Sequence, residues 1–275
     1  MLGYNEMFAG RFDEASANAQ KGIALMERLY RLRPGDHDVQ HRLQGAYDAQ
    51  LVLIPPTIPA SALIEHNLQL ARRMLDLDRQ RFDLEPDEPI ANWRATGVDW
   101  NHLGIWSFLK GDHAAALGDF LQAQSAFEKT AADAHNAQVK MDLARIRMNL
   151  GRTEVAAGRL DEAREVLLKN LAALQEIIIR SDTYEIRYFR AACEEELGSI
   201  ELQQALASRD VHQQLHHWQA AYDWFARSAP VLEQIAHIAT LSIWDRAPVE
   251  RAVAGLARSA AEIRGREQQL AAAPH

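Results

Sequence analysis

Strict alternation of apolar and polar residues, the pattern of a half-buried strand, is nearly absent from this chain. Long stretches such as residues 133–157 and 160–180 are instead built from Ala, Leu, Gln, Glu and Arg, which are good helix formers. Only 14 glycines and 9 prolines interrupt a sequence of 275 residues. The pattern therefore predicts an all-α protein.

A Leu-Gly pair recurs along the chain at a fixed interval. The leucines of three pairs are Leu103, Leu150 and Leu197, which are separated by two intervals of 47 residues. A further pair lies at residues 2–3. The segments over residues 9–15 and 157–163 differ at one position of seven. A repeat of this kind predicts an array of similar structural units.

The repeated residues predict a helical hairpin. The glycine of the Leu-Gly pair lacks a Cβ, so a neighbouring helix can approach closely. A second glycine seven residues later, as at Gly111 and Gly158, is expected to end the first helix in a left-handed conformation. A small residue then follows where the two helices cross, at Ala15, Ala116 and Ala163.

These residues resemble the tetratricopeptide repeat family, whose pattern is W-x2-L-G, a later Gly, and A-x3-F-x2-A. The fullest match consists of Trp100, Leu103, Gly104, Gly111, Ala116, Phe120 and Ala123. Partial matches are Leu2, Gly3, Gly10 and Ala15; Leu150, Gly151, Gly158, Ala163 and Leu167; and Leu197, Gly198, Trp218, Ala221 and Phe225. The resemblance implies a tetratricopeptide-like superhelix, an α-solenoid of antiparallel hairpins with a long, bacterial-type period.

The resemblance also implies how the chain is organised. We expect a single domain of about five hairpins over residues 1–33, 36–83, 90–131, 133–181 and 184–240. A last helix over residues 246–270, with a polar outer face, is expected to cap the array. Because the first Leu-Gly pair lies at residues 2–3, we expect a fragment of a longer polypeptide or a shortened first helix.

Charge and cysteine content narrow the classes of partner. A formal net charge of −8 argues against non-specific binding to nucleic acid or to anionic membranes. No apolar run approaches the ~18 residues of a membrane span, and no signal peptide is visible. The lone cysteine, Cys193, fits a reducing compartment. We therefore expect a cytoplasmic protein.

The family resemblance also suggests a binding surface, because the first helix of each tetratricopeptide hairpin lines a concave groove. Carried over position by position, the groove residues are Asn101, Ile105, Phe108, Arg145, Met148, Asn149, Arg152, Glu195, Glu196 and Ser199. Arg145, Asn149 and Arg152 share one helical stripe. Their charges and amide are suited to a peptide carboxylate or an acidic segment, with a plain solvated stripe as the alternative.

Three other features invite a chemical interpretation. The proline-rich loop over residues 52–61 is expected either to pack back on the array or to present apolar residues to a partner. His212 and His216 have the i, i+4 spacing of zinc ligands but lack the Glu of HExxH and a third ligand, so we expect no metal. The run over residues 194–196 is expected to be a solvated acidic face.

The function expected from these observations is that of a non-catalytic protein–protein interaction scaffold, without a cofactor, that binds a peptide or partner domain in its groove. A second copy of the chain, giving a homodimer, is a further candidate partner. The alternative is a C-terminal regulatory or sensory module of a larger bacterial signalling protein, such as a serine/threonine kinase. An enzyme is the third class, and it would require His, Asp and Glu side chains to converge in one pocket.

Overall fold

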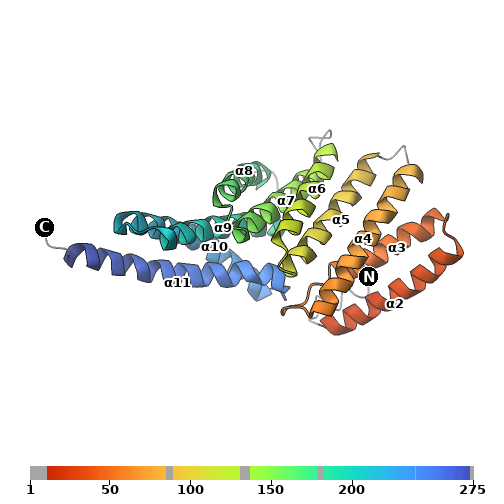
Figure 1. The fold of residues 1–275 in the computed structure, drawn as a ribbon, viewed down its shortest axis with the longest axis horizontal. Coiled ribbons are helices and arrows are strands. Elements are labelled where there is room, and N and C mark those ends of the chain that lie inside the picture. The colour runs from red at the N-terminus through yellow and green to blue at the C-terminus, as the bar shows by residue number, and fades with distance from the viewer. Residues whose placement is uncertain (1–10, 85–88, 131–136, 179–182, 239, 273–275) are drawn as a thin grey trace. The chain divides into compact units, whose positions relative to one another are not determined.

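The computed structural model describes residues 11–84, 89–130, 137–178, 183–238 and 240–272. Within these ranges the chain forms ten α-helices and no strand (Figure 1). The helices are α2 (Phe12–Leu32), α3 (His37–Leu51), α4 (Ser61–Leu84), α5 (Pro89–Leu109), α6 (His113–Thr130), α7 (Ala137–Ala156), α8 (Leu160–Ile178), α9 (Tyr184–Ala207), α10 (Val211–Ile238) and α11 (Ile243–Ala272). The fold is therefore an all-α solenoid, as the sequence predicted.

The chain divides into two compact units. Unit 1 comprises residues 1–146 and 239–243, and unit 2 comprises residues 147–238 and 244–275. The division falls inside α7, so the first part of this helix belongs to unit 1 and the rest to unit 2. The organisation as a single domain of five hairpins stays a prediction. The first Leu-Gly pair and Gly10 lie outside the described residues.

The turns inside two hairpins confirm the role expected of the second glycine. Gly111 and Gly158 have φ angles of 86° and 75°, in the left-handed region. Asp112 follows the first of these glycines, and its Oδ1 accepts a hydrogen bond from the backbone N–H of Ala115 at 3.0 Å. The glycine thus ends one helix, and the aspartate satisfies a free N–H at the start of the next.

Close helix contacts explain the glycine of the Leu-Gly pair. A Cβ at Gly104, Gly151 or Gly198 would lie 2.5–2.7 Å from a side-chain carbon of the following helix. Those side chains are Phe120, Leu167 and Phe225. The crossing alanines of α2, α6 and α8 are each 0% exposed, so the small-residue prediction is also confirmed.

The main apolar cluster of unit 1 lies among α2, α3, α4 and α5. Trp106 is fully buried in it, and its Nε1 donates a hydrogen bond to the carbonyl oxygen of Leu51 at 3.1 Å. Leu43, Leu68 and Met74 contribute apolar side chains that are at most 3% exposed. An indole buried in this way needs a partner for its N–H, and the last carbonyl of α3 supplies one.

Helix α11 packs against α10 within unit 2. A Cβ at Gly255 would lie 2.5 Å from the ring of Phe225, and Ala252 is 0% exposed. No residue of α11 beyond Ser259 is buried among those described. The helix therefore has one buried stripe, and its expected role as the C-terminal cap of the array stays a prediction.

Candidate functional site

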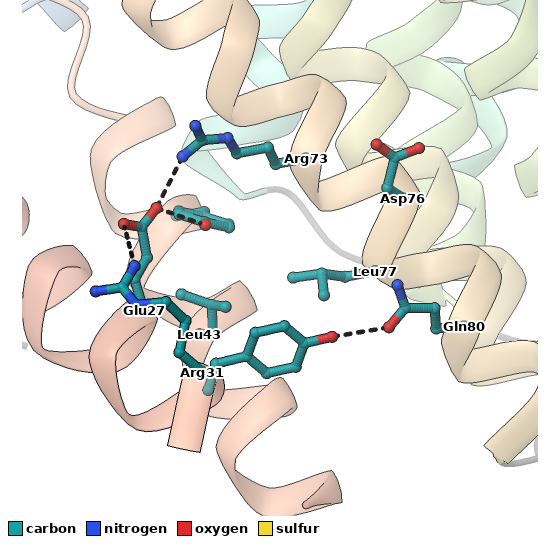
Figure 2. A pocket seen from close by; sticks show the side chains of 9 residues that line it. Glu27, Arg31, Leu43, Arg73, Asp76, Leu77 and Gln80 are labelled. Carbon is teal, nitrogen blue, oxygen red and sulfur yellow. Dashed lines mark hydrogen bonds and ion pairs between the residues drawn. The ribbon is translucent and has the colours of Figure 1, made fainter. Parts of the chain in front are cut away.

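A pocket opens in unit 1 between α2, α3 and α4 (Figure 2). Its volume is about 350 Å³. Leu43 and Leu77 supply apolar side chains that are 2% and 6% exposed. The polar lining consists of Glu27, Tyr30, Arg31, Tyr47, Arg73, Asp76 and Gln80. The pocket is therefore mainly polar, with two apolar side chains among its nine lining residues.

Glu27 is the polar centre of this pocket. Its Oε1 accepts hydrogen bonds from the hydroxyl of Tyr47 at 2.9 Å and from Nη1 of Arg73 at 2.8 Å. Its Oε2 lies 4.0 Å from Nη1 of Arg31. Burial, with the hydrogen bond to Glu27 and its charge, raises the pKa of Tyr47 to about 12. Tyr47 is therefore a permanent donor at neutral pH.

A second cavity of about 650 Å³ shares Glu27 and Arg73 with the first. Its lining is mostly apolar and includes Ile23, Leu63 and Leu70 from α2 and α4. The two cavities together form a depression along α2 and α4, which we call the α2–α4 groove. Sequence reasoning missed it, because its lining comes from helix faces that no motif marks.

Two buried aspartates form a separate cluster in unit 1. Asp78 and Asp99 are 1% and 3% exposed. Asp78 Oδ1 accepts hydrogen bonds from Gln44 Nε2 at 2.9 Å and from Arg81 Nη2 at 2.7 Å. Burial, followed by the charge of Asp78, raises the pKa of Asp99 well above its ordinary value. The two carboxyl groups therefore resist being ionised at the same time.

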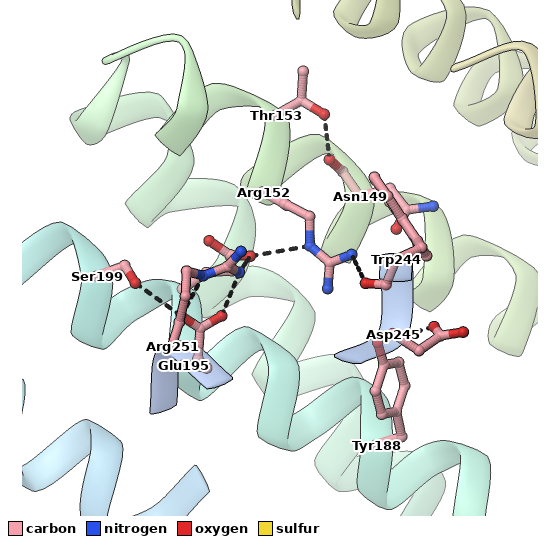
Figure 3. A network of polar contacts seen from close by, with 10 residues as sticks. Asn149, Arg152, Thr153, Tyr188, Glu195, Ser199, Trp244, Asp245 and Arg251 are labelled. Carbon is pink, nitrogen blue, oxygen red and sulfur yellow. Dashed lines mark hydrogen bonds and ion pairs between the residues drawn. The ribbon is translucent and has the colours of Figure 1, made fainter. Parts of the chain in front are cut away.

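Unit 2 contains a larger polar network that joins α7, α9 and α11 (Figure 3). Arg152 Nε donates to Glu196 Oε1 at 3.0 Å, and its Nη1 donates to the carbonyl oxygen of Trp244 at 3.2 Å. The Arg152 guanidinium also lies 4.4 Å from the Trp244 ring centroid. Arg251 of α11 bonds both oxygens of Glu195, at 2.8 and 2.6 Å, and reaches Glu196 as well.

The chemistry of this network is that of an internal ion cluster. Glu195 and Glu196 are 0% and 2% exposed, so two adjacent carboxylates share the positive charges of Arg152 and Arg251. Burial, followed by the charge of Glu196, raises the pKa of Glu195 to about 7. The expectation that residues 194–196 form a solvated face is wrong. The packing of α9 buries all three. Arg152 and Arg251, which are distant in sequence, pair with Glu195 and Glu196, whereas Glu194 pairs with Arg190, four residues earlier on the same helix.

The residues predicted to line a groove are divided between the units. In unit 1, Asn101 and Ile105 are buried, whereas Phe108 and Arg145 are partly exposed. The Phe108 ring packs against His113 at a centroid distance of 4.7 Å. Burial removes much of the expected contact surface, and the peptide-binding role of these four residues stays a prediction.

The remaining predicted groove residues lie in unit 2. Met148, Asn149 and Arg152 are at most 3% exposed, and Glu195 is fully buried. Ser199 is partly exposed, and its hydroxyl donates to Glu195 Oε1 at 2.8 Å. Arg152 binds groups of its own chain, so it is not the solvent-facing charge that the stripe suggested. Glu196, the sixth of these residues, is 2% exposed. The peptide-binding role of all six also stays a prediction.

The histidines and the proline-rich loop have more ordinary surroundings. His217 Nδ1 lies 2.7 Å from Glu201 Oε2, and the described residues contain no group of three or more His, Cys, Asp or Glu side chains placed to hold a metal. In the loop, Leu53 is buried but Ile58 is 83% exposed. The loop therefore packs back on unit 1 and still presents one apolar side chain to solvent.

The fold defines the class of protein, that of all-α helical-repeat proteins. No protein-family profile and no curated protein matches the chain. The crystal structure of BtubC (BKLC) from P. vanneervenii is similar, with a TM-score of 0.50 and 14% identity over 96% of this chain and 94% of that chain. Yeast Tom70 matches 90% of this chain and 61% of its own at 12% identity, with a TM-score of 0.23. The likeness to BtubC is one of fold.

None of the helices in the described ranges is long and apolar enough to cross a membrane.

Proposed function

We propose that this protein is a non-catalytic scaffold of tetratricopeptide-like repeats that binds a segment of a partner protein in the α2–α4 groove. The observation that carries the proposal is the groove itself. Two cavities, of about 350 and 650 Å³, meet at the Glu27–Arg73 ion pair. An elongated depression of this kind suits a peptide or helix better than it suits a compact substrate.

The lining of the groove supports a protein partner. Ile23, Leu63 and Leu70 provide apolar contact area, and Glu27 and Arg73 lie between the two cavities. Protein interfaces combine apolar contacts with hydrogen bonds, and the groove offers both. We expect the partner segment to insert two or three apolar side chains and to pair a charged group with Glu27 or Arg73.

The buried carboxylates favour a structural role over a catalytic one. Glu195 and Glu196 are bonded to Arg152 and Arg251 inside the protein. A general acid or base must reach a substrate, whereas in the described part of the chain these carboxyl groups are bonded to arginines of their own unit. The single cysteine of the chain fits the reducing cytoplasm, where we expect the scaffold to act.

Site-specific photocrosslinking tests the proposal. Ala24 lines the larger cavity, whereas the neighbouring Leu25 is 59% exposed and lies outside the lining of both cavities. A benzophenone amino acid at position 24, in cells of the source organism, should yield a discrete crosslinked protein, and the same group at position 25 should not. Equal yields at both positions, or none at either, would refute the groove assignment.

A further inference from the structure

Helix α11 lies on the surface of unit 2 that the family resemblance predicted to bind a peptide (Figure 3). Arg152, one of the predicted groove residues, donates from Nη1 to the carbonyl oxygen of Trp244. Glu195, another of them, accepts hydrogen bonds at both carboxylate oxygens from Arg251. The chain therefore places its own C-terminal helix where a partner segment was expected.

The contact between α11 and the rest of unit 2 uses few large apolar side chains of α11. All residues of this helix are described, and Trp244 and Val249 are the only large apolar ones among the six that are buried. Polar groups add to the contact at its start, where the hydroxyl of Tyr188 donates to Asp245 Oδ1 at 3.1 Å. Permanent interfaces resemble a hydrophobic core, whereas transient ones are more polar, as this contact is.

Two buried polar atoms at this contact have no hydrogen-bond partner in the described part of the chain. They are Trp218 Nε1 and Ser259 Oγ of α11. The ring centroid of Trp218 lies 5.5 Å from the guanidinium carbon of Arg258, also of α11. Burying a polar group without a partner costs free energy. A helix that satisfies these atoms would therefore compete with α11 for the same surface.

Two buried carboxylates define what a competing helix must carry. Glu195 and Glu196 are both bonded to Arg251. In the described part of the chain their other cationic partner is Arg152. A guanidinium can pair with both carboxylates at once because its five N–H donors form a planar fork, whereas an ammonium is a point charge. The helix must therefore bring an arginine, and the net charge of −8 favours a basic helix.

A tryptophan marks the other end of the contact. Trp244 and Arg251 are seven residues apart and share one face of α11. The Trp244 ring centroid lies 4.4 Å from the guanidinium carbon of Arg152, so this surface offers a cation to an aromatic ring and two carboxylates to an arginine. We call the surface formed by Arg152, Tyr188, Glu195 and Glu196 the α11 site.

We infer that the α11 site is a helix-binding site, which α11 occupies in cis as an autoinhibitory helix until a helix of a partner protein displaces it. The partner helix is amphipathic and carries a tryptophan and an arginine at the spacing of Trp244 and Arg251. Because α11 begins a few residues after α10 ends, its effective concentration at the site is high, and the partner has to compete with it. The inference goes beyond the proposed function, since it concerns unit 2 and uses no residue of the α2–α4 groove.

Fluorescence anisotropy with labelled helical peptides tests this inference. One probe has the sequence of α11, and the other is an Ala- and Gln-based helix that shares with it only the tryptophan and the arginine. The wild-type chain should bind both weakly, because α11 competes in cis. Full-length Arg251→Ala has a weakened cis contact and should bind both at least about tenfold more tightly. Peptides in which alanine replaces the arginine should gain no affinity.

Two further variants make the comparison decisive. Arg264→Ala removes the same charge from an exposed position of α11, and it should bind the peptides as the wild type does. Arg251→Lys keeps the charge but not the planar fork, so it should show an intermediate gain even if Arg251→Ala does not fold. Circular dichroism and urea titration check that each variant is folded. No gain in either Arg251 variant, or an equal gain with Arg264→Ala, would overturn the inference.

Hydrogen exchange of the wild-type chain requires no substitution. The amides of α11 should exchange faster than those of α9, and faster still when either peptide is added. A helix that serves only as a structural part of unit 2 would exchange together with α9 and would not respond to the peptides, which contradicts the inference.

Light scattering tests whether a second copy of the chain is the occupant instead. We expect a wild-type monomer. A wild-type dimer that Arg251→Ala abolishes would assign the site to α11 of another copy, and the assignment to a partner protein would be wrong. Photocrosslinking at Ala24 reports on unit 1, so a failure of the scaffold proposal and a failure of this inference are distinguishable.

Discussion

Gly198 lies directly against the ring of Phe225, so that a Cβ on this glycine would be 2.7 Å from the nearest ring carbon. The contact joins α9 to α10 at the level where Gly255 of α11 approaches the same ring. The ring is therefore held between two helices that each carry a glycine at the point of contact. Because the ring has no room to move toward either helix, this part of unit 2 is sensitive to added volume.

The first prediction concerns Gly198→Ala. The added methyl group must push the Phe225 ring aside, so we expect the free energy of unfolding to fall by about 1–3 kcal/mol. Urea titration followed by circular dichroism measures the change. Gly265→Ala is the matched control, because nothing lies within 4 Å of a Cβ at that position of α11. It should instead stabilise the protein by roughly 0.5–1 kcal/mol, through the helix propensity of alanine.

The second prediction concerns the turn at Gly158, whose φ of 75° is disfavoured for residues with a Cβ. Gly158→Ala should destabilise the protein by about 1–2 kcal/mol, although no atom lies within 4 Å of the new Cβ. Gly158→Asn should cost less, because asparagine tolerates the left-handed region better. Equal stability of the alanine and asparagine variants would argue that the backbone conformation is not the cause.

The third prediction concerns Arg152→Glu. The substitution places a third carboxylate beside Glu195 and Glu196 and removes the donor to the Trp244 carbonyl. Breaking a buried ion pair costs about 3–5 kcal/mol, so we expect partial or complete unfolding of unit 2. Arg145→Glu alters a partly exposed charge and should be milder. A monomeric, fully helical Arg152→Glu protein of unchanged stability would contradict the buried network.

The fourth prediction concerns pH. Glu195 has a folded-state pKa of about 7 against an ordinary value of 4.5, so the unfolded chain loses this proton first as the pH rises. The contribution of Glu195 to the free energy of unfolding is therefore fully present below pH 4.5, the ordinary pKa of a glutamate. This contribution is lost as the pH rises through about 7, the pKa of Glu195 in the folded protein. Asp99, whose pKa is also raised, acts in the same direction. The protein should be more stable at pH 5 than at pH 8.

Glu195→Gln tests the origin of this pH dependence. The amide cannot titrate, so the difference between the free energies of unfolding at the two pH values should shrink in the variant. Asp99→Asn should reduce the difference further when the two changes are combined. If both variants keep the full wild-type pH dependence, other groups are responsible for it.

The features that sequence could predict are local ones. The turn glycines, the crossing alanines and the glycine of each Leu-Gly pair are set by backbone geometry within one hairpin. A fixed spacing along the chain is enough to place such residues, since the two helices of a hairpin are joined by a short turn. The capping role of α11 stays a prediction, since it rests only on the general need of an array for a terminal helix with a polar face.

The buried charges could not be predicted in this way. From the sequence alone, Glu195 belongs to an acidic run that is expected to be exposed. In the structure it is bonded to Arg251, which lies 56 residues later in the chain. Asp78 and Asp99 come from different helices with no motif to connect them. In each case the relevant interaction is between segments distant in sequence, and spacing along the chain does not encode it.

Cys193 has a practical consequence. Its thiol is buried, accepts a hydrogen bond from Asn170 at 3.3 Å, and has a pKa raised by burial to about 12. Maleimide reagents react with the thiolate, and at neutral pH this thiol is protonated and buried. We therefore expect no modification of Cys193 in the native protein. Any cysteine introduced on the surface would then be the sole labelling position, ready for a dye or a spin label. If the native thiol is modified slowly, the rate of modification would measure how often the contact between α8 and α9 opens.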